Sequence, residues 1–124
     1  MPLPHPISDE LLRLIAHRFH LLGEPMRLRL LDRLRDGDAT VQELADALET
    51  SQQNVSKHLG MLAEAGILAR RKDGTRVQYR IGDEEVLALC EQMCGSLEHE
   101  LRGLAALADD LAARPVALTL QQME

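Results

Sequence analysis

Aromatic residues are nearly absent from this chain of 124 residues, which holds one Phe, one Tyr and no Trp. Its core must therefore be aliphatic, and 45% hydrophobic residues suffice for one small domain. The chain also lacks an apolar run of membrane-spanning length, and its opening MPLPHPISDE lacks the charged and apolar regions of a signal peptide. We therefore expect a cytoplasmic protein with no membrane partner. Its two cysteines would be reduced there, so a structural disulfide is not expected.

The segment from Val41 to Gly66, VQELADALETSQQNVSKHLGMLAEAG, has the pattern of two short helices joined by a tight turn. The first helix has an apolar face formed by Val41, Leu44, Ala45 and Leu48. Thr50 or Ser51 can then accept a hydrogen bond from a free amide at the start of the next helix, which is expected to begin near Ser51. This layout predicts a helix-turn-helix, a motif that reads DNA.

The second helix of the pair combines an apolar stripe with a cluster of polar side chains. The predicted stripe consists of Val55, Leu59, Leu62 and Ala63. Amides can bond an adenine edge in two places, and Lys can meet guanine or phosphate. Base readers usually lie near the amino-terminal end of such a helix, so we predict DNA contacts from Gln52, Gln53, Asn54, Ser56, Lys57 and His58. The alternative is a pair of core helices with a polar surface.

The residues after Gly66, ILARRKDGTRVQYRI, predict a basic β-hairpin. Asp73-Gly74 lies between alternating apolar residues, which is a strong hairpin signal. Its tip and flanks are suited to phosphates beside the groove, and the predicted DNA contacts here are Arg70, Arg71, Lys72, Thr75 and Arg76. A basic hairpin directly after a reading helix predicts a winged helix-turn-helix.

Charge is distributed unevenly along the chain. The whole chain carries −6, yet from Gln52 to Arg80 six cations oppose two acids, a local charge of +4 that leaves −10 for the remainder. Global acidity argues against a nucleic-acid partner. A local basic patch can nevertheless hold DNA while the acidic remainder limits nonspecific binding, and the affinity should then depend steeply on salt.

The segment LLGEPMRLRLLDRL adds a third motif, formed by Gly23, Glu24, Pro25, Arg27 and Leu28. From about Phe19 to about Leu101, the chain resembles the ArsR/SmtB family of bacterial winged-helix repressors. The resemblance implies a homodimer that binds double-stranded operator DNA near its own or a neighbouring promoter. It also implies that an inducer releases the dimer from DNA.

Two further helices are predicted near the ends of the chain, from about Asp9 to Leu22 with Ser8 as a cap, and from about Asp83 to Ala113. Each carries a one-sided apolar seam: Leu11, Leu12, Ile15, Phe19 and Leu22 in the first, and Val86, Cys90, Met93, Leu97, Leu101, Leu104, Ala108 and Leu111 in the second. A single small domain covers such a long seam only partly, so symmetric dimerisation is expected to bury it.

We therefore expect a mainly α fold with a small β-hairpin, a winged helix-turn-helix that dimerises through its N- and C-terminal helices. Residues 1–114 would form the DNA-binding and dimerisation domain, and residues 115–124 a loose C-terminal tail. Two other classes stay open. One is a winged-helix protein-interaction module without DNA binding. The other is a thiol enzyme, which is disfavoured because the chain lacks the tight redox-motif spacing, a Ser/His/Asp set and a phosphate loop.

Cys90 and Cys94 are the candidate inducer-sensing thiols. Their side-chain roots would lie about 5–6 Å apart on one helix face, whereas a relaxed disulfide needs about 4 Å. Three interpretations stay open. The cysteines are small apolar residues of a helix interface, thiol sensors of redox or sulfur species, or ligands that bind a soft metal ion or arsenite across a dimer.

The metal sites of the family are matched only in part. Its arsenic-type members carry a Cys-Val-Cys run before the reading helix, and the corresponding segment Ala39 to Leu44 has no cysteine. At the positions of the zinc-type ligand pairs stand Asp83 and Glu85, then Ser96 and His99. The resemblance therefore implies no certain cofactor, with Asp83, Glu85 and His99 as weak metal candidates.

Overall fold

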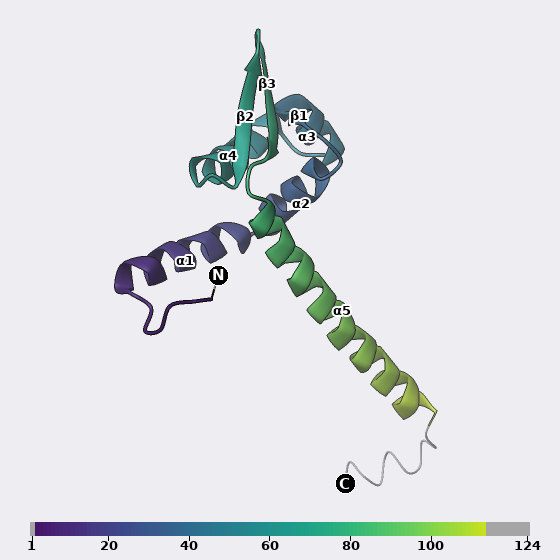
Figure 1. Cartoon of the computed structure of the whole chain (residues 1–124). Coiled ribbons are helices and arrows are strands. Elements are labelled where there is room, and N and C mark those ends of the chain that lie inside the picture. The colour runs from purple at the N-terminus through teal and green to yellow at the C-terminus, as the bar shows by residue number, and fades with distance from the viewer. Residues whose placement is uncertain (1, 114–124) are drawn as a thin grey trace. The chain divides into compact units, whose positions relative to one another are not determined.

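The structure, a computed structural model, describes residues 2–113 (Figure 1). The chain divides after Glu84 into two compact units. The first unit holds α1 (Asp9–Leu22), α2 (Pro25–Leu34), β1 (Ala39–Thr40), α3 (Val41–Ala47), α4 (Gln52–Glu64), β2 (Leu68–Asp73) and β3 (Arg76–Ile81). The second unit is formed by α5 (Glu84–Ala112) from its second residue onward. The mainly α fold with a β-hairpin is confirmed, whereas the predicted tail, residues 115–124, lies outside the described residues. The extent of the predicted domain, residues 1–114, stays a prediction.

Side-chain caps determine where the helices begin. Ser8 caps α1 and Ser51 caps α4, in each case through its hydroxyl oxygen, which accepts a backbone amide of the first turn. Both starts agree with the sequence prediction. Glu24 does the same for α2 with its carboxylate, and Thr40 and Glu43 form a reciprocal capping box at α3. Within residues 2–113, no helix is long and apolar enough to cross a membrane.

The sheet has one strand more than the sequence predicted. Its order is β1-β3-β2, all antiparallel, and the two-residue β1 pairs Ala39 with Tyr79 and Thr40 with Gln78. Two residues are too few to show an alternating pattern, so β1 left no signal in the sequence. This strand ties the start of α3 to the hairpin.

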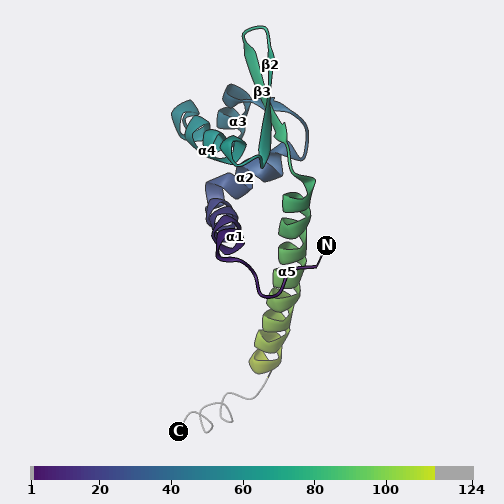
Figure 2. The same cartoon turned by 60° about the vertical axis from the view of Figure 1, so that its left-hand side comes forward.

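The wing, defined here as residues 68–81, is the predicted hairpin of β2 and β3. Asp73 pairs with Arg76, which leaves Gly74 and Thr75 as a two-residue loop. Gly74 has a φ of +64°, as such short hairpin loops require. Figure 2 shows the wing extending away from α3 and α4.

The core of the first unit is aliphatic, as expected from the composition. Its largest fully buried side chains are Leu21, Leu30, Leu44, Val55, Leu59, Leu62 and Ile67. Three of them lie on α4 and confirm the predicted stripe of that helix, although Ala63 is only half-buried. The opposite side of α4 is therefore the side that faces away from the core.

A glycine cap ends α4. Gly66 has a φ of +78°, and its amide donates to the Ala63 carbonyl while the Ile67 amide donates to the Leu62 carbonyl, each at 3.0 Å. This pair of bonds is a Schellman motif, and the side chains of Leu62 and Ile67 are fully buried beside it.

We expect Gly66→Ala to lower the free energy of unfolding by about 1 kcal/mol, because the left-handed conformation strains any residue with a Cβ. Urea unfolding measures the change. Gly60→Ala is the matched control, since Gly60 lies inside α4 with open space around an added Cβ and should gain roughly 0.5–1 kcal/mol. Equal stabilities of the two variants would contradict the role of the cap.

Candidate nucleic-acid interface

The first two turns of α4 present polar side chains to solvent. Gln52, Gln53, Ser56 and Lys57 are all exposed. A depression of about 380 Å³ is lined by Ser51, Gln53, Asn54 and Lys57. Amide, hydroxyl and ammonium groups around one hollow can donate and accept hydrogen bonds at base edges, which is the chemistry that the sequence predicts for this face.

Asn54 differs from its neighbours on this face. Its side chain is half-buried, and its Nδ2 donates to Thr50 Oγ1 at 3.1 Å. Its backbone amide donates to Ser51 Oγ at 3.1 Å. Asn54 therefore helps to fix the turn before α4 and lies at the edge of the polar face.

The prediction that His58 lies on the polar face of α4 is wrong, because the structure buries this residue. His58 is only 9% exposed, and its Nδ1 accepts a hydrogen bond from Arg27 Nε at 3.2 Å. Helical spacing contained the signal, because His58 follows Val55 by three residues and precedes Leu62 by four. The spacing put His58 in the stripe, whereas its polar chemistry suggested the opposite face.

The cations of the wing lie on both of its faces. In the register of the hairpin, Arg70 is opposite Tyr79 and Lys72 is opposite Val77. These two cations therefore lie on the face of the wing that also carries the buried side chain of Tyr79. Arg71, opposite Gln78, projects from the other face. All three are exposed, so the wing can meet phosphates on either side.

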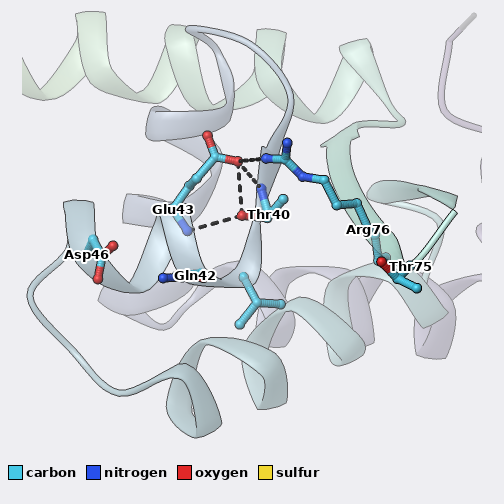
Figure 3. Close-up of a pocket in the computed structure, with 8 residues that line it drawn as sticks. Thr40, Gln42, Glu43, Asp46, Thr75 and Arg76 are labelled. Atoms are coloured by element: carbon cyan, nitrogen blue, oxygen red, sulfur yellow. Dashed lines mark hydrogen bonds and ion pairs between the residues drawn. The ribbon is translucent and has the colours of Figure 1, made fainter. Parts of the chain in front are cut away.

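Arg76, also on the wing, is held by an acid of the helix-turn-helix (Figure 3). Its Nη2 lies 3.3 Å from Glu43 Oε1, which also accepts hydrogen bonds from the amide of Thr40 at 3.1 Å and from Thr40 Oγ1 at 2.9 Å. These Thr40 hydrogen bonds, with a smaller contribution from Arg76, lower the pKa of Glu43. The carboxylate is therefore ionised at neutral pH, and a phosphate would have to compete with it for Arg76.

The two cysteines of α5 differ in environment. Cys90 is half-buried, and this burial raises the pKa of its thiol. Cys94 is exposed, with Sγ 4.0 Å from Glu98 Oε1. Both thiols are free. Since the thiolate is the reactive form, the environment of Cys90 disfavours its reaction.

The weak metal candidates do not assemble into a site within one chain. In residues 2–113, no three side chains of His, Cys, Asp or Glu come together in a way that could hold a metal ion. Asp83 instead forms an ion pair with Arg18, with Oδ2 3.1 Å from Nη1. The same guanidinium donates through Nη2 to the Ala65 carbonyl at the end of α4, at 2.9 Å.

A capped helix with a polar outer face, preceded by a short helix and followed by a basic wing, defines the winged helix-turn-helix class of DNA-binding proteins. A family described as a helix-turn-helix domain matches residues 22–71. Regulators that are similar to this chain over most of its length identify the family more specifically than this domain match does. This chain belongs to the ArsR/SmtB family of winged helix-turn-helix transcriptional regulators.

Three similar proteins illustrate this membership. KmtR of Mycobacterium tuberculosis, an HTH-type transcriptional regulator, is 32% identical over 101 residues, which are 82% of this chain and 78% of KmtR. The homodimeric winged helix-turn-helix DNA-binding domain of Mb0332 from Mycobacterium bovis is 29% identical, with a TM-score of 0.71 over 82% of this chain and 94% of that one. The antimony-specific transcriptional repressor AntR is 32% identical, with a TM-score of 0.70 over 80% and 90%. KmtR is named as a transcriptional regulator, AntR as a transcriptional repressor, and Mb0332 as a possible ArsR-family transcriptional regulator.

Proposed function

We propose that this chain is a homodimeric transcriptional repressor that binds operator DNA and leaves it when an inducer binds. The observation that carries the proposal is the polar outer face of α4 directly followed by a wing with cations on both faces. AntR is a repressor by name, and the domain of Mb0332 is described as a homodimeric DNA-binding domain. Together these features favour a repressor over a protein-interaction module.

The proposed DNA contacts divide into two groups. Side chains of α4 read base edges in the major groove: Gln52, Gln53, Ser56 and Lys57, with Asn54 at their edge. Side chains of the wing hold phosphates: Arg70, Arg71, Lys72, Thr75 and Arg76. His58 is left out because its ring is buried beneath this face.

A second copy of the chain is the proposed cover for the apolar side chains of the two terminal helices. On α1, Leu12, Leu14 and Phe19 are 46–60% exposed. On α5 the exposed apolar side chains are Leu89, Met93, Leu97, Leu101, Leu104, Leu107 and Leu111. So many apolar side chains on two helices exceed what scattered surface residues explain.

The inducer is proposed to act on Cys90 and Cys94. Two chains would supply four thiols, a set suited to a soft metal ion or a metalloid, and the antimony specificity of AntR favours that chemistry. Oxidation or persulfide formation is the alternative, and there the exposed Cys94 should react first. A purely apolar role of both residues is the third outcome of the test.

The test titrates the purified dimer on a duplex from its own promoter region with zinc, arsenite, antimonite, peroxide and polysulfide. We expect the wild type to bind this duplex and one reagent class to release it. The variant Cys90→Ser/Cys94→Ser should bind equally tightly and respond to none, as fluorescence anisotropy would show. A double variant that still releases DNA would exclude the thiols. Failure of the wild type to bind any duplex at low salt would favour the interaction module.

A further inference from the structure

Arg27 and His58 form a buried polar contact between α2 and α4. They are the two buried polar residues in the described part of the chain, 8% and 9% exposed. Arg27 Nε donates to His58 Nδ1 at 3.2 Å, and Arg27 Nη1 donates to the Leu21 carbonyl at 2.9 Å. In residues 2–113, no buried side-chain nitrogen or oxygen lacks a partner. The guanidinium therefore joins the last turn of α1 to the middle of α4.

The contact requires one form of the His58 ring. A guanidinium can only donate, so Nδ1 must accept with its lone pair, and the proton of the neutral ring is on Nε2. Nε2 lies 4.0 Å from Glu24 Oε2, the same oxygen that accepts the amides of Met26 and Arg27 at the start of α2. Glu24 thus caps the helix that carries Arg27 and also faces the ring that Arg27 contacts.

The position of His58 on α4 gives this contact a functional consequence. Ser56 and Lys57 precede it directly, and Gln53 lies about one and a half turns earlier on the exposed side. The remaining stripe residues, Val55 and Leu59 among them, are fully buried and make apolar contacts, whose attraction is non-directional. A hydrogen bond between two rigid planar groups fixes both a direction and a distance.

We infer that Arg27 and His58 are positioning residues that set how α4 presents its side chains to base edges, an inference that rests on the proposed function. The pair thereby determines sequence discrimination without touching DNA. Wing contacts to phosphate do not depend on this orientation. Loss of the pair should therefore weaken binding to the operator more than binding to unrelated DNA.

The experiment compares two ring replacements. His58→Asn keeps an acceptor near the position of Nδ1, whereas His58→Leu fills similar space without one. The wild type first selects its preferred duplex from a random-sequence pool, and each protein is then titrated on that duplex and on a shuffled duplex of equal composition. We expect His58→Leu to lower the ratio of the two affinities about tenfold, within what one bidentate base contact supplies. His58→Asn should keep most of the ratio.

Two controls separate positioning from loss of folding. Stoichiometric titration gives the active fraction, and Arg71→Ala should weaken both duplexes while keeping their ratio. If His58→Leu does not fold, ¹⁵N NMR of the wild-type imidazole still decides, because the inference requires an unprotonated Nδ1 and a protonated Nε2 at neutral pH. The opposite tautomer, or an unchanged ratio in folded His58→Leu, overturns it. A wild type that selects no sequence instead overturns the proposed function.

Discussion

The double variant Arg71→Ala/Lys72→Ala is expected to bind every duplex on the order of 1,000-fold more weakly at about 0.1 M salt. The two side chains project from opposite faces of the wing, and a dimer would lose four phosphate contacts. Each such contact releases counterions, so the slope of log affinity against log salt should flatten by about 3.6. Anisotropy titrations between about 0.05 and 0.3 M salt measure both quantities.

The control for this prediction removes two cations that lie outside the basic stretch from Gln52 to Arg80. Arg29 of α2 and Arg35, which directly follows this helix, are both exposed, so Arg29→Ala/Arg35→Ala makes the same change in net charge. It should leave affinity and salt slope near those of the wild type. By contrast, Gln53→Ala should keep the salt slope and change the preferred sequence. Unchanged binding of the Arg71 and Lys72 variant at moderate salt would contradict the role of the wing.

Arg76 is expected to contribute less than its neighbours on the wing. Phosphate must displace the Glu43 carboxylate from its guanidinium, so the gain from contacting DNA is reduced by the loss of an existing ion pair. This pair is exposed and salt-screened, which keeps the loss small. The Thr40 hydrogen bonds hold the Glu43 carboxylate in place, so the end of the wing next to its loop is restrained before DNA arrives.

The sequence predicts local features well, namely helix caps and turns formed by residues that are close together in the chain. Ser8, Ser51 and the Asp73-Gly74 turn each act on residues only a few positions away, and all three lie where expected. Thr40 and Glu43 have the spacing of a capping box, so that contact was also readable from sequence. The partner of Glu43 was not, because Arg76 lies 33 residues further along the chain.

His58 shows the same limit on a buried residue. Its spacing within α4 indicated burial, but nothing in the sequence named a partner able to satisfy its ring nitrogen. Arg27 lies 31 residues away, in the segment LLGEPMRLRLLDRL, whose pattern indicates the family but no contact with α4. A polar side chain is buried where a hydrogen-bond partner satisfies it. A partner on another helix can be identified only once the three-dimensional structure is known.

Placing acids in the seam of α5, through Leu97→Asp/Leu104→Asp, is expected to convert the dimer to a monomer. Burying one leucine contributes about 1.5–3 kcal/mol, and a dimer would lose four. The summed loss of about 6–12 kcal/mol is comparable with the whole binding energy of a nanomolar dimer, about 12 kcal/mol. Sedimentation velocity over a range of protein concentrations measures the shift, and the monomer should bind operator DNA far more weakly because two half-sites are no longer held together.

The matched control is Gln92→Asp/His99→Asp, which adds two acids with the same spacing to the opposite side of α5. Both positions are exposed, and neither belongs to the seam. Leu→Asp lowers helix propensity more than Gln→Asp or His→Asp does, so circular dichroism first compares the helix content of the two double variants. Where the helix content is equal, a difference in dimerisation reports the face and not the helix. A control that also becomes monomeric would show that α5 fails through lost helicity. A seam variant that stays dimeric would mean that a second chain does not cover Leu97 and Leu104, and dimerisation would then have to use α1 alone.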